Sequence, residues 1–192
     1  MSAEIKPVGV LAGEGALPLE LVHYCQRNNI PVCAVHFKQC DYSEWPDIDI
    51  LNTRLEKVGD IFKFFKKHHV KNVVMIGNLK RPSLKSLRPD LRGIKTLGRI
   101  AGSFAKGDDN LLRSLRQEIE DEGFVVRGVD YYLNDLTVSC GSLTNKQFSC
   151  EQNAFLNRAI DIAIKHGADD KGQSILAHEN GDYSYEGPEG TT

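Results

Sequence analysis

Three short apolar runs, each associated with a segment of helical spacing, constrain the fold of this chain more than any other feature. The runs are Val8 to Leu11, Pro31 to Phe37 and Asn72 to Ile76, and helices are expected over 17–28 and 57–68 between them. Strands that are apolar at nearly every position are buried on both faces, as in parallel sheets covered by helices. The sequence therefore predicts an α/β fold with a Rossmann-like, three-layer parallel sheet.

Later segments continue this alternation. Helical spacing recurs over 94–105 and 108–122, and a fourth strand is expected at Phe124–Val126, before an irregular region over 130–149. The buried side of the helix over 108–122 is expected to carry Leu111, Leu112, Leu115 and Ile119. We expect a Rossmann-like domain over 1–149, a linker helix over 150–170 and an incomplete second domain over 171–192.

A glycine turn follows the first apolar run. Gly13 and Gly15 let the backbone approach a ligand closely, and Pro18 fits the first turn of the next helix, whose amides favour an anion. The alternative is a tight strand-to-helix turn without a ligand. NAD is disfavoured, because Pro18 replaces the third small residue of the dinucleotide fingerprint and Ala34 to His36 offer no acid for the ribose.

A second candidate loop, Gly77 to Pro82, follows the third apolar run. Ligands bind beyond the carboxyl ends of parallel strands, so this loop and the first glycine turn are expected at one edge. Asn78 offers a donor and an acceptor, and Lys80 and Arg81 can neutralise phosphate. The alternative is a solvated basic turn.

A third candidate segment begins at Lys106, which we expect to contact an anion. Asp108 and Asp109 start the following helix, where they either cap it or hold a divalent cation or ligand hydroxyl groups. We expect Gly15, Asn78 and Lys106 to meet at one edge of the sheet.

Composition excludes several classes of protein. The formal net charge is −2, with acidic and basic residues dispersed, so a general nucleic-acid binder is not indicated. The five cysteines, at 25, 33, 40, 140 and 150, have no CxxC spacing, which argues against a zinc site and a disulfide framework. No apolar run has the length of a signal peptide or a membrane span. A cytoplasmic protein is expected.

Five motifs in order resemble one family. They are GEGALP at 13–18, GNLKRP at 77–82, KGDDNLLR at 106–113, GQS at 172–174 and EGTT at 189–192. Together they resemble the UDP-2,3-diacylglucosamine pyrophosphatases of the LpxI type. The chain differs from the family pattern at Ser174, at Glu179-Asn180 and at Thr192.

The resemblance implies a hydrolase of lipid A biosynthesis that splits UDP-2,3-diacylglucosamine with water into UMP and 2,3-diacylglucosamine 1-phosphate (lipid X). It implies magnesium as cofactor and a cytoplasmic location with peripheral contact to the inner membrane, and a homodimer is a further expectation. The family has a Rossmann-like N-terminal domain and a catalytic C-terminal domain. The chain resembles the first of these and the start of the second, so no catalytic residue is expected in it and the chain alone is expected to be inactive.

The resemblance implies substrate contacts at Ala16, in the loop from Gly77 to Lys80, at Lys106 and at Thr191. With the candidates from the residues themselves, the expected substrate-binding set is Gly13, Gly15, Ala16, Gly77, Asn78, Leu79, Lys80, Arg81, Lys106 and Thr191, and the candidate metal ligands are Asp108 and Asp109. Alternatives are a nucleotide- or phosphosugar-binding module without catalysis, a NAD-linked oxidoreductase and an interaction-only protein.

Overall fold

The computed structural model describes most of the chain and divides it into two compact units. The described residues are 6–38, 40, 45–79, 88–104, 108–138, 145, 148–169, 172, 174–178 and 180–186. Unit 1 comprises residues 1–138 and unit 2 residues 139–192. Each unit is described by itself below.

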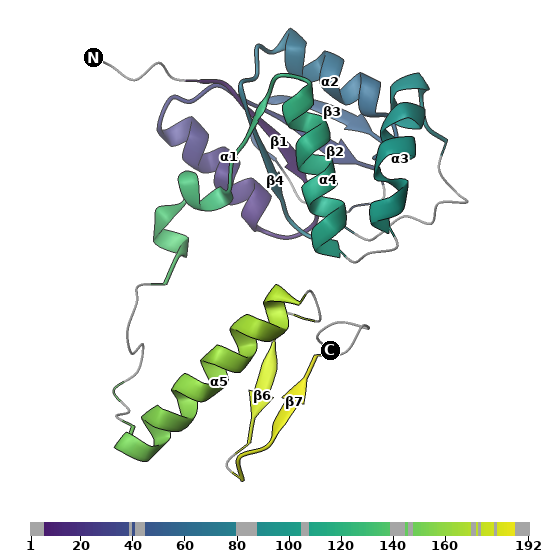
Figure 1. The fold of residues 1–192 in the computed structure, drawn as a ribbon. Coiled ribbons are helices and arrows are strands. Elements are labelled where there is room, and N and C mark those ends of the chain that lie inside the picture. Colours follow the sequence, from purple (N-terminus) through teal and green to yellow (C-terminus); the bar gives the residue numbers. More distant parts are fainter. Residues whose placement is uncertain are drawn as a thin grey trace. The chain divides into compact units, whose positions relative to one another are not determined.

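Unit 1 is built on a five-stranded sheet in which every neighbouring pair is parallel, in the order β3-β2-β1-β4-β5. The strands are β1 Val8–Ala12, β2 Val32–Phe37, β3 Asp49–Thr53, β4 Asn72–Ile76 and β5 Val125–Val126. The central strand β1 pairs with β2 on one side and β4 on the other, so the order reverses beside β1 (Figure 1). This confirms the predicted Rossmann-like parallel sheet.

The strand β3 is not among the strands that the sequence predicts. Asp49–Thr53 pairs in parallel with β2, and only Thr53 in it is fully buried. Its Asp-Ile-Leu-Asn-Thr sequence is interrupted by the polar Asp49 and Asn52, so it lacks the near-continuous apolar run of β1, β2 and β4. An edge strand with polar positions therefore carries too weak a pattern to be recognised.

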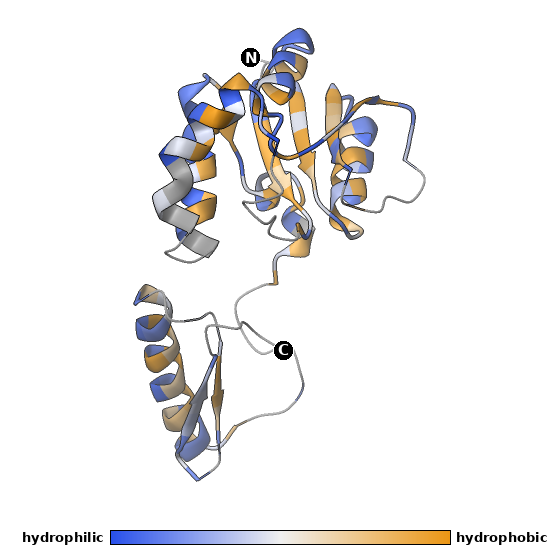
Figure 2. Cartoon of the chain, turned by 90° about the vertical axis from the view of Figure 1, so that its right-hand side faces the viewer, coloured by the Kyte–Doolittle hydropathy of each residue, from blue (hydrophilic) through white to orange (hydrophobic). Residues whose placement is uncertain are grey.

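Helices cover both faces of the sheet and make the three layers. They are α1 Leu17–Arg27, α2 Val58–Lys67, α3 Leu91–Phe104 and α4 Asp108–Asp121, followed by the short 3₁₀ helices η2 Val129–Tyr131 and η3 Asn134–Leu136. The chain after β5 lies on the face that α1 covers, while α2 and α4 pack on the other face and α3 packs against these two helices. The strands of unit 1 are mostly hydrophobic, whereas its helices alternate between hydrophobic and hydrophilic residues (Figure 2).

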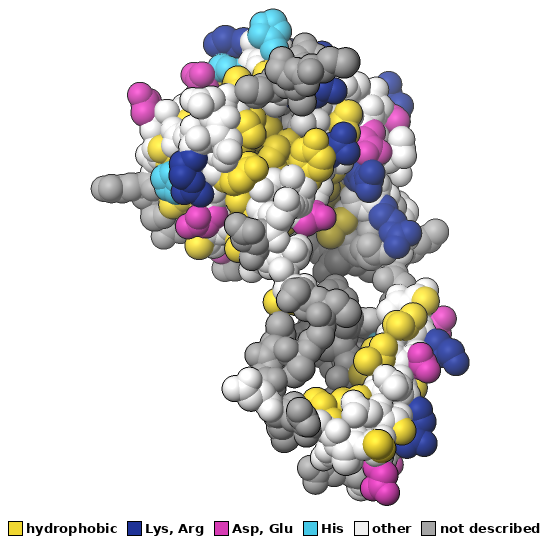
Figure 3. All heavy atoms as spheres, turned by 90° about the vertical axis from the view of Figure 1, so that its left-hand side faces the viewer, with side chains coloured by type: hydrophobic (Ala, Val, Ile, Leu, Met, Phe, Trp, Pro, Cys, Tyr) yellow, Lys and Arg dark blue, Asp and Glu magenta, His cyan; other side chains and the backbone are white. Residues whose placement is uncertain are grey.

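Two hydrophobic cores lie on opposite faces of the sheet. On the α1 face, Leu21 and Val22 pack with the strand residues Val10 and Val74. On the other face, the core includes Phe62, Phe65 and Ile119. Because one helix and a short irregular segment cover the α1 face, hydrophobic side chains reach the surface there (Figure 3). Leu112, expected on the buried side of α4, is instead 52% exposed.

Two buried cysteines are packing residues. Cys25 on α1 and Cys33 on β2 lie in the two cores. Burial raises the pKa of Cys25 to about 11 and that of Cys33 to about 12, where Asp49 adds to the effect. Both thiols therefore stay protonated at neutral pH and behave as small apolar groups.

Unit 2 combines the helix α5, Cys150–Ala168, with an antiparallel pair, β6 Ile175–Ala177 and β7 Tyr183–Tyr185. Ser149 caps the helix: its hydroxyl accepts from the Gln152 amide, and the Gln152 side chain accepts from the Ser149 amide. Phe155 of the helix stacks on Tyr183 with the ring centroids 6.0 Å apart. Among the described residues, no helix combines the length and apolar composition that crossing a bilayer requires.

Candidate functional site

The loops that follow β1 and β4 are joined by backbone hydrogen bonds at the carboxyl edge of the sheet. The Gly13 amide donates to Ile76 O at 2.8 Å, and beyond it Glu14 and Asn78 form an antiparallel bridge. In that bridge the Glu14 amide donates to Asn78 O at 2.7 Å and the Asn78 amide donates to Glu14 O at 2.9 Å. The two loops named from the sequence thus form one continuous backbone surface at the point where the strand order reverses.

Gly13 and Gly77 are needed because these two loops touch each other. A Cβ on Gly13 would lie 2.5 Å from Asn78 O, and a Cβ on Gly77 would lie 2.7 Å from the Gly13 carbonyl carbon. Gly77 also has φ +93°, a conformation that favours glycine. The close approach that these two glycines permit is therefore between the loops themselves.

Gly15 and Ala16 lie at the exposed side of the first loop. Gly15 has φ +107°, and a Cβ placed on it meets no atom within 4 Å. Ala16 precedes α1 and offers no side chain to cap the helix, while Pro18 occupies the first turn without an amide hydrogen. The amides of Leu17 and Leu19 are therefore the donors that the first turn can direct at an anion.

Some residues of the loop after β4 are exposed to solvent and others pack against the core. Gly77 and Asn78 are exposed, whereas the partly buried Leu79 packs against the core on the α2 and α4 face. Leu79 therefore has a packing role in addition to its predicted ligand role. Lys80 and Arg81 lie outside the described residues.

The helix α4 begins at the same edge. It begins at Asp108 and leads into β5, which runs parallel to β4, so its first residue lies beside the carboxyl ends of the strands (Figure 1). The side chains of Asp108 and Asp109, and all of Lys106 and Thr191, lie outside what the structure describes. Among the described residues, no three His, Cys, Asp or Glu side chains gather in a metal-binding group.

An aromatic pair that the sequence did not indicate lies at the end of β2. His36 pairs in register with Ala12, the last residue of β1, and is only 6% exposed. The Trp45 ring meets the His36 imidazole edge-on, with centroids 4.2 Å apart. Trp45 belongs to a segment with no recognisable pattern, so only the fold brings it to this edge.

The pH dependence of stability should report on His36. Burial lowers the pKa of His36 below its ordinary value of 6.5, so the unfolded chain binds more protons than the folded chain as the pH falls through that value. We expect unfolding free energy to decrease with acidification there. Urea unfolding across this pH range should show a weaker dependence in His36→Gln. The same change at the half-buried His23 on α1 serves as control, and equal pH slopes in wild type and His36→Gln would contradict the assignment.

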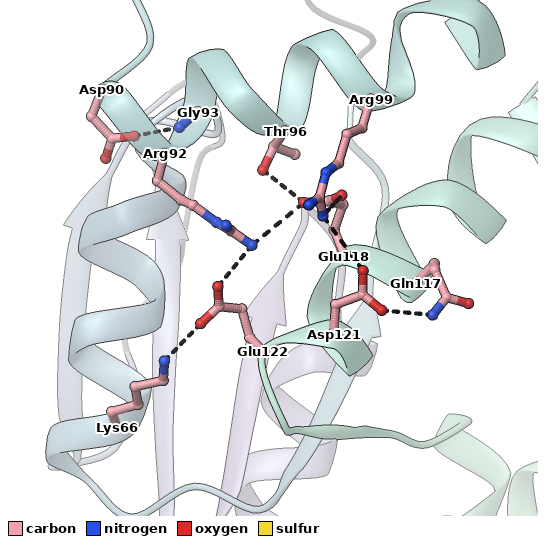
Figure 4. Close-up of polar contacts among 10 residues, drawn as sticks. All are labelled: Lys66, Asp90, Arg92, Gly93, Thr96, Arg99, Gln117, Glu118, Asp121 and Glu122. Atoms are coloured by element: carbon pink, nitrogen blue, oxygen red, sulfur yellow. Dashed lines mark hydrogen bonds and ion pairs between the residues drawn. The ribbon is translucent and has the colours of Figure 1, made fainter.

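An ionic network fixes α3 and α4 to each other and to α2 (Figure 4). The buried Glu118 of α4 accepts hydrogen bonds from Thr96 Oγ1 at 3.0 Å and from Arg99 Nη1 at 2.9 Å. Arg92 lies between Glu118 and Glu122, with Nη2 2.7 Å from Glu122 Oε1. The network therefore supports the helix whose first turn lies at the candidate site.

Glu122 links this network to α2. Lys66 Nζ donates to Glu122 Oε2 at 2.6 Å, and this hydrogen bond is the largest cause that lowers the pKa of Glu122, with the charge of Arg92 adding to it. A carboxyl with a lowered pKa stabilises the fold above its unfolded pKa, and this contribution is lost as the pH falls through the folded value. The network therefore weakens in acid.

Comparison with known proteins identifies the family of this chain. The family model described as the LpxI N-terminal domain matches residues 7–136, which is most of unit 1. UDP-2,3-diacylglucosamine pyrophosphatase LpxI of Caulobacter vibrioides is 31% identical to this chain over 190 residues, a match that covers 97% of this chain and 67% of that protein. Both findings agree with the resemblance that the five motifs indicate. The chain therefore belongs to the LpxI family.

Proposed function

We propose that this chain takes part in the hydrolysis of UDP-2,3-diacylglucosamine to UMP and lipid X, and that unit 1 binds the nucleotide-sugar diphosphate. The observation that carries the proposal is the 31% identity with a protein of that named activity along 97% of this chain. The bridged loops after β1 and β4 support it, because they put exposed backbone at the usual ligand edge of this fold.

The diphosphate would lie against the exposed part of these loops. Gly15 and Ala16 lead into the uncapped first turn of α1, and Asn78 is exposed beside them in the bridge. Amides and Asn78 would orient the phosphate oxygens, and Lys80 and Lys106 would supply positive charge. Such groups assist hydrolysis by stabilising the charge that develops on the phosphoryl oxygens as water attacks. We assign this chain a binding role and propose that it does not hydrolyse the substrate by itself.

We also propose that Mg²⁺ accompanies the substrate. Magnesium keeps several waters and binds through phosphate oxygens with one or two carboxylates, so a cage of protein ligands is not required. The described edge carries one carboxylate side chain in the bridged loops, that of Glu14, and Asp108 and Asp109 are the further candidates at the start of α4. When bound, the ion would neutralise phosphate charge.

The location and assembly that we propose are the cytoplasm, with peripheral contact to the inner membrane, and a homodimer. The substrate carries two acyl chains, so an enzyme that acts on it has to meet a lipid surface or accept a lipid from one. Sedimentation of the purified chain tests the dimer. A monomer over the concentrations used for ligand binding would contradict that part of the proposal.

Ligand binding to the purified chain tests the proposed function. We expect UMP, UDP-N-acetylglucosamine and lipid X to raise the melting temperature in the presence of Mg²⁺, because a ligand that binds only the folded state stabilises it. NADH should have no effect. Lys80→Ala and Lys106→Ala should each weaken nucleotide binding about tenfold or more, since a hydrogen bond to a charged group contributes about 1.5–3 kcal/mol.

The matched control is Lys63→Ala, at an exposed position on α2, which should leave binding unchanged. Stabilisation by NADH but by no uridine nucleotide would favour the oxidoreductase alternative and contradict the proposal. Release of UMP from UDP-2,3-diacylglucosamine by this chain alone would contradict the purely binding role.

A further inference from the structure

The outer face of α3 presents two large apolar side chains to solvent. Leu91 is 89% exposed and Ile94, one turn further along, is 58% exposed. Side chains three residues apart lie on the same face of a helix, so these two form one apolar stripe. Single exposed apolar residues are common, but an adjacent pair on a structured helix calls for an explanation.

The other side of α3 is fixed, so the stripe cannot turn inward. Asp90 Oδ1 accepts from the Gly93 amide at 2.6 Å, and Asp90 Oδ2 accepts from the Gly59 amide of α2 at 2.9 Å. On that side, Arg99 binds a carboxylate of α4 and Arg92 binds that of Glu122, just after α4 (Figure 4). Rotation of the helix would break these contacts, and Leu91 and Ile94 are therefore held outward by the same residues that hold α3 in place.

Basic residues accompany the apolar stripe. Arg88, just before the helix, and Lys95, next to Ile94, are both exposed. Of the four basic residues in 88–99, Arg92 and Arg99 pair with carboxylates on the other side of the helix, so Arg88 and Lys95 are the two that accompany the stripe. The one acid in this range, Asp90, accepts two backbone amides. An apolar stripe flanked by Lys and Arg is typical of helices that lie in the interface of an anionic membrane.

We propose that the α3 outer face, defined by Arg88, Leu91, Ile94 and Lys95, binds the surface of a bilayer that contains anionic phospholipid. A stable protein interface buries about 800 Å² on each partner, far more than two aliphatic side chains provide, whereas a bilayer needs only a few inserted apolar groups and neighbouring cations. The proposal deepens the proposed function and rests on it in one respect, the lipid nature of the substrate. It names the surface of unit 1 that would meet the membrane.

Sedimentation with vesicles tests the proposal without any substrate. We expect the purified chain to bind vesicles of phosphatidylcholine mixed with phosphatidylglycerol more tightly than vesicles of phosphatidylcholine alone. Leu91→Gln/Ile94→Gln should weaken binding to the mixed vesicles about tenfold or more, because the inserted apolar area is removed. Arg88→Ala/Lys95→Ala should weaken it about tenfold or more and reduce the preference for anionic lipid, because the negative potential of that surface attracts basic residues.

The matched control is Leu136→Gln, because Leu136 on η3 is 52% exposed and lies outside the α3 outer face. It should bind vesicles like the wild type, and every variant should keep the wild-type melting temperature. The proposal is overturned if the wild type binds neither vesicle, if Leu91→Gln/Ile94→Gln binds the mixed vesicles like the wild type, or if Leu136→Gln weakens binding equally.

The same variants also test whether the α3 outer face binds a protein instead of a membrane. Self-association of the wild type in the absence of lipid that Leu91→Gln/Ile94→Gln abolishes would assign the face to a second copy of the chain and overturn the membrane proposal. Binding of UMP and of UDP-N-acetylglucosamine should be unchanged in all these variants. If the wild type binds vesicles but no uridine nucleotide, the proposed function fails while the membrane surface stands.

Discussion

Gly13→Ala is expected to lower the free energy of unfolding by about 3 kcal/mol, at the upper end of the usual cost of overpacking a buried position. The new Cβ would lie 2.5 Å from Asn78 O and 2.7 Å from the Gly77 carbonyl carbon, and both are backbone atoms that no rotamer change can move away. The two loops must therefore separate. Separation breaks the Glu14–Asn78 bridge, in which each hydrogen bond contributes about 1 kcal/mol.

The matched control for this prediction is Gly98→Ala. Gly98 lies within α3, and a Cβ on it meets no atom within 4 Å. Alanine there should stabilise the protein by about 0.5–1 kcal/mol, because glycine loses more conformational freedom in a helix. Urea unfolding measures both changes. The assigned contact between the loops is wrong if the two variants change stability in the same direction.

Gly13→Ala should also weaken binding of uridine nucleotides, because Gly15 and Asn78 belong to the loops that it separates. Gly98→Ala should leave this binding unchanged. Nucleotide affinity equal to that of the wild type in a folded Gly13→Ala protein would show that the bridged loops do not bind the ligand.

Glu118→Gln is expected to lower the free energy of unfolding by about 2 kcal/mol, because it removes the buried negative charge that Arg92 and Arg99 pair with. Glutamine has the volume of glutamate and can still accept from Thr96, so packing is kept while the negative charge is lost. Arg99 and Arg92 then lie beside a neutral amide, 2.9 and 3.7 Å from the atoms that replace the carboxylate oxygens. Since both guanidinium groups reach solvent, the cost stays below that of a fully buried pair.

Glu120→Gln provides the matched control on the same helix. Glu120 pairs with Arg116 at 2.9 Å across one turn, with its side chain 30% exposed. Such a surface pair contributes at most about 0.5 kcal/mol. Urea unfolding at neutral pH compares the two variants. Equal losses would mean that burial of Glu118 does not strengthen its interactions, and the network would then have no special role in holding α3 to α4.

The fold was predictable where the residues of a segment specify its structure by themselves. The apolar runs that became β1, β2 and β4 are buried on both faces, so their composition alone identified a parallel sheet. Pro18 marked the start of α1, because proline fits the first turn of a helix. Each of these signals lies within the segment that it describes.

Other features depend on contacts between distant segments and were not predictable. The segment that forms β3 has a weak pattern and becomes a strand because β2 offers it an edge. Leu112 fits the apolar spacing of its helix but is exposed, because neighbouring helices decide which side of α4 is covered. The partners of Glu118 and Glu122 come from other helices, and no spacing in the sequence connects them.

The candidate site has features that local sequence predicts and others that depend on contacts between distant segments. The sequence identified both glycine-containing loops and their shared edge, which follow from the rule for parallel sheets. It did not reveal that glycine is needed at 13 and 77 because the two loops touch each other, since this depends on how closely the ends of β1 and β4 approach. The site residues Lys80, Arg81, Lys106 and Thr191 stay predictions.

The central position of β1 has a consequence for biosynthesis. β1 is synthesised before both of its neighbours in the sheet, yet the side that receives β4 has no partner until the chain has been synthesised through Ile76. Pairing across so long a separation forms slowly, and an unpaired strand edge is prone to aggregation. We therefore expect the sheet to close only after β4 has been synthesised, however stable the finished sheet is.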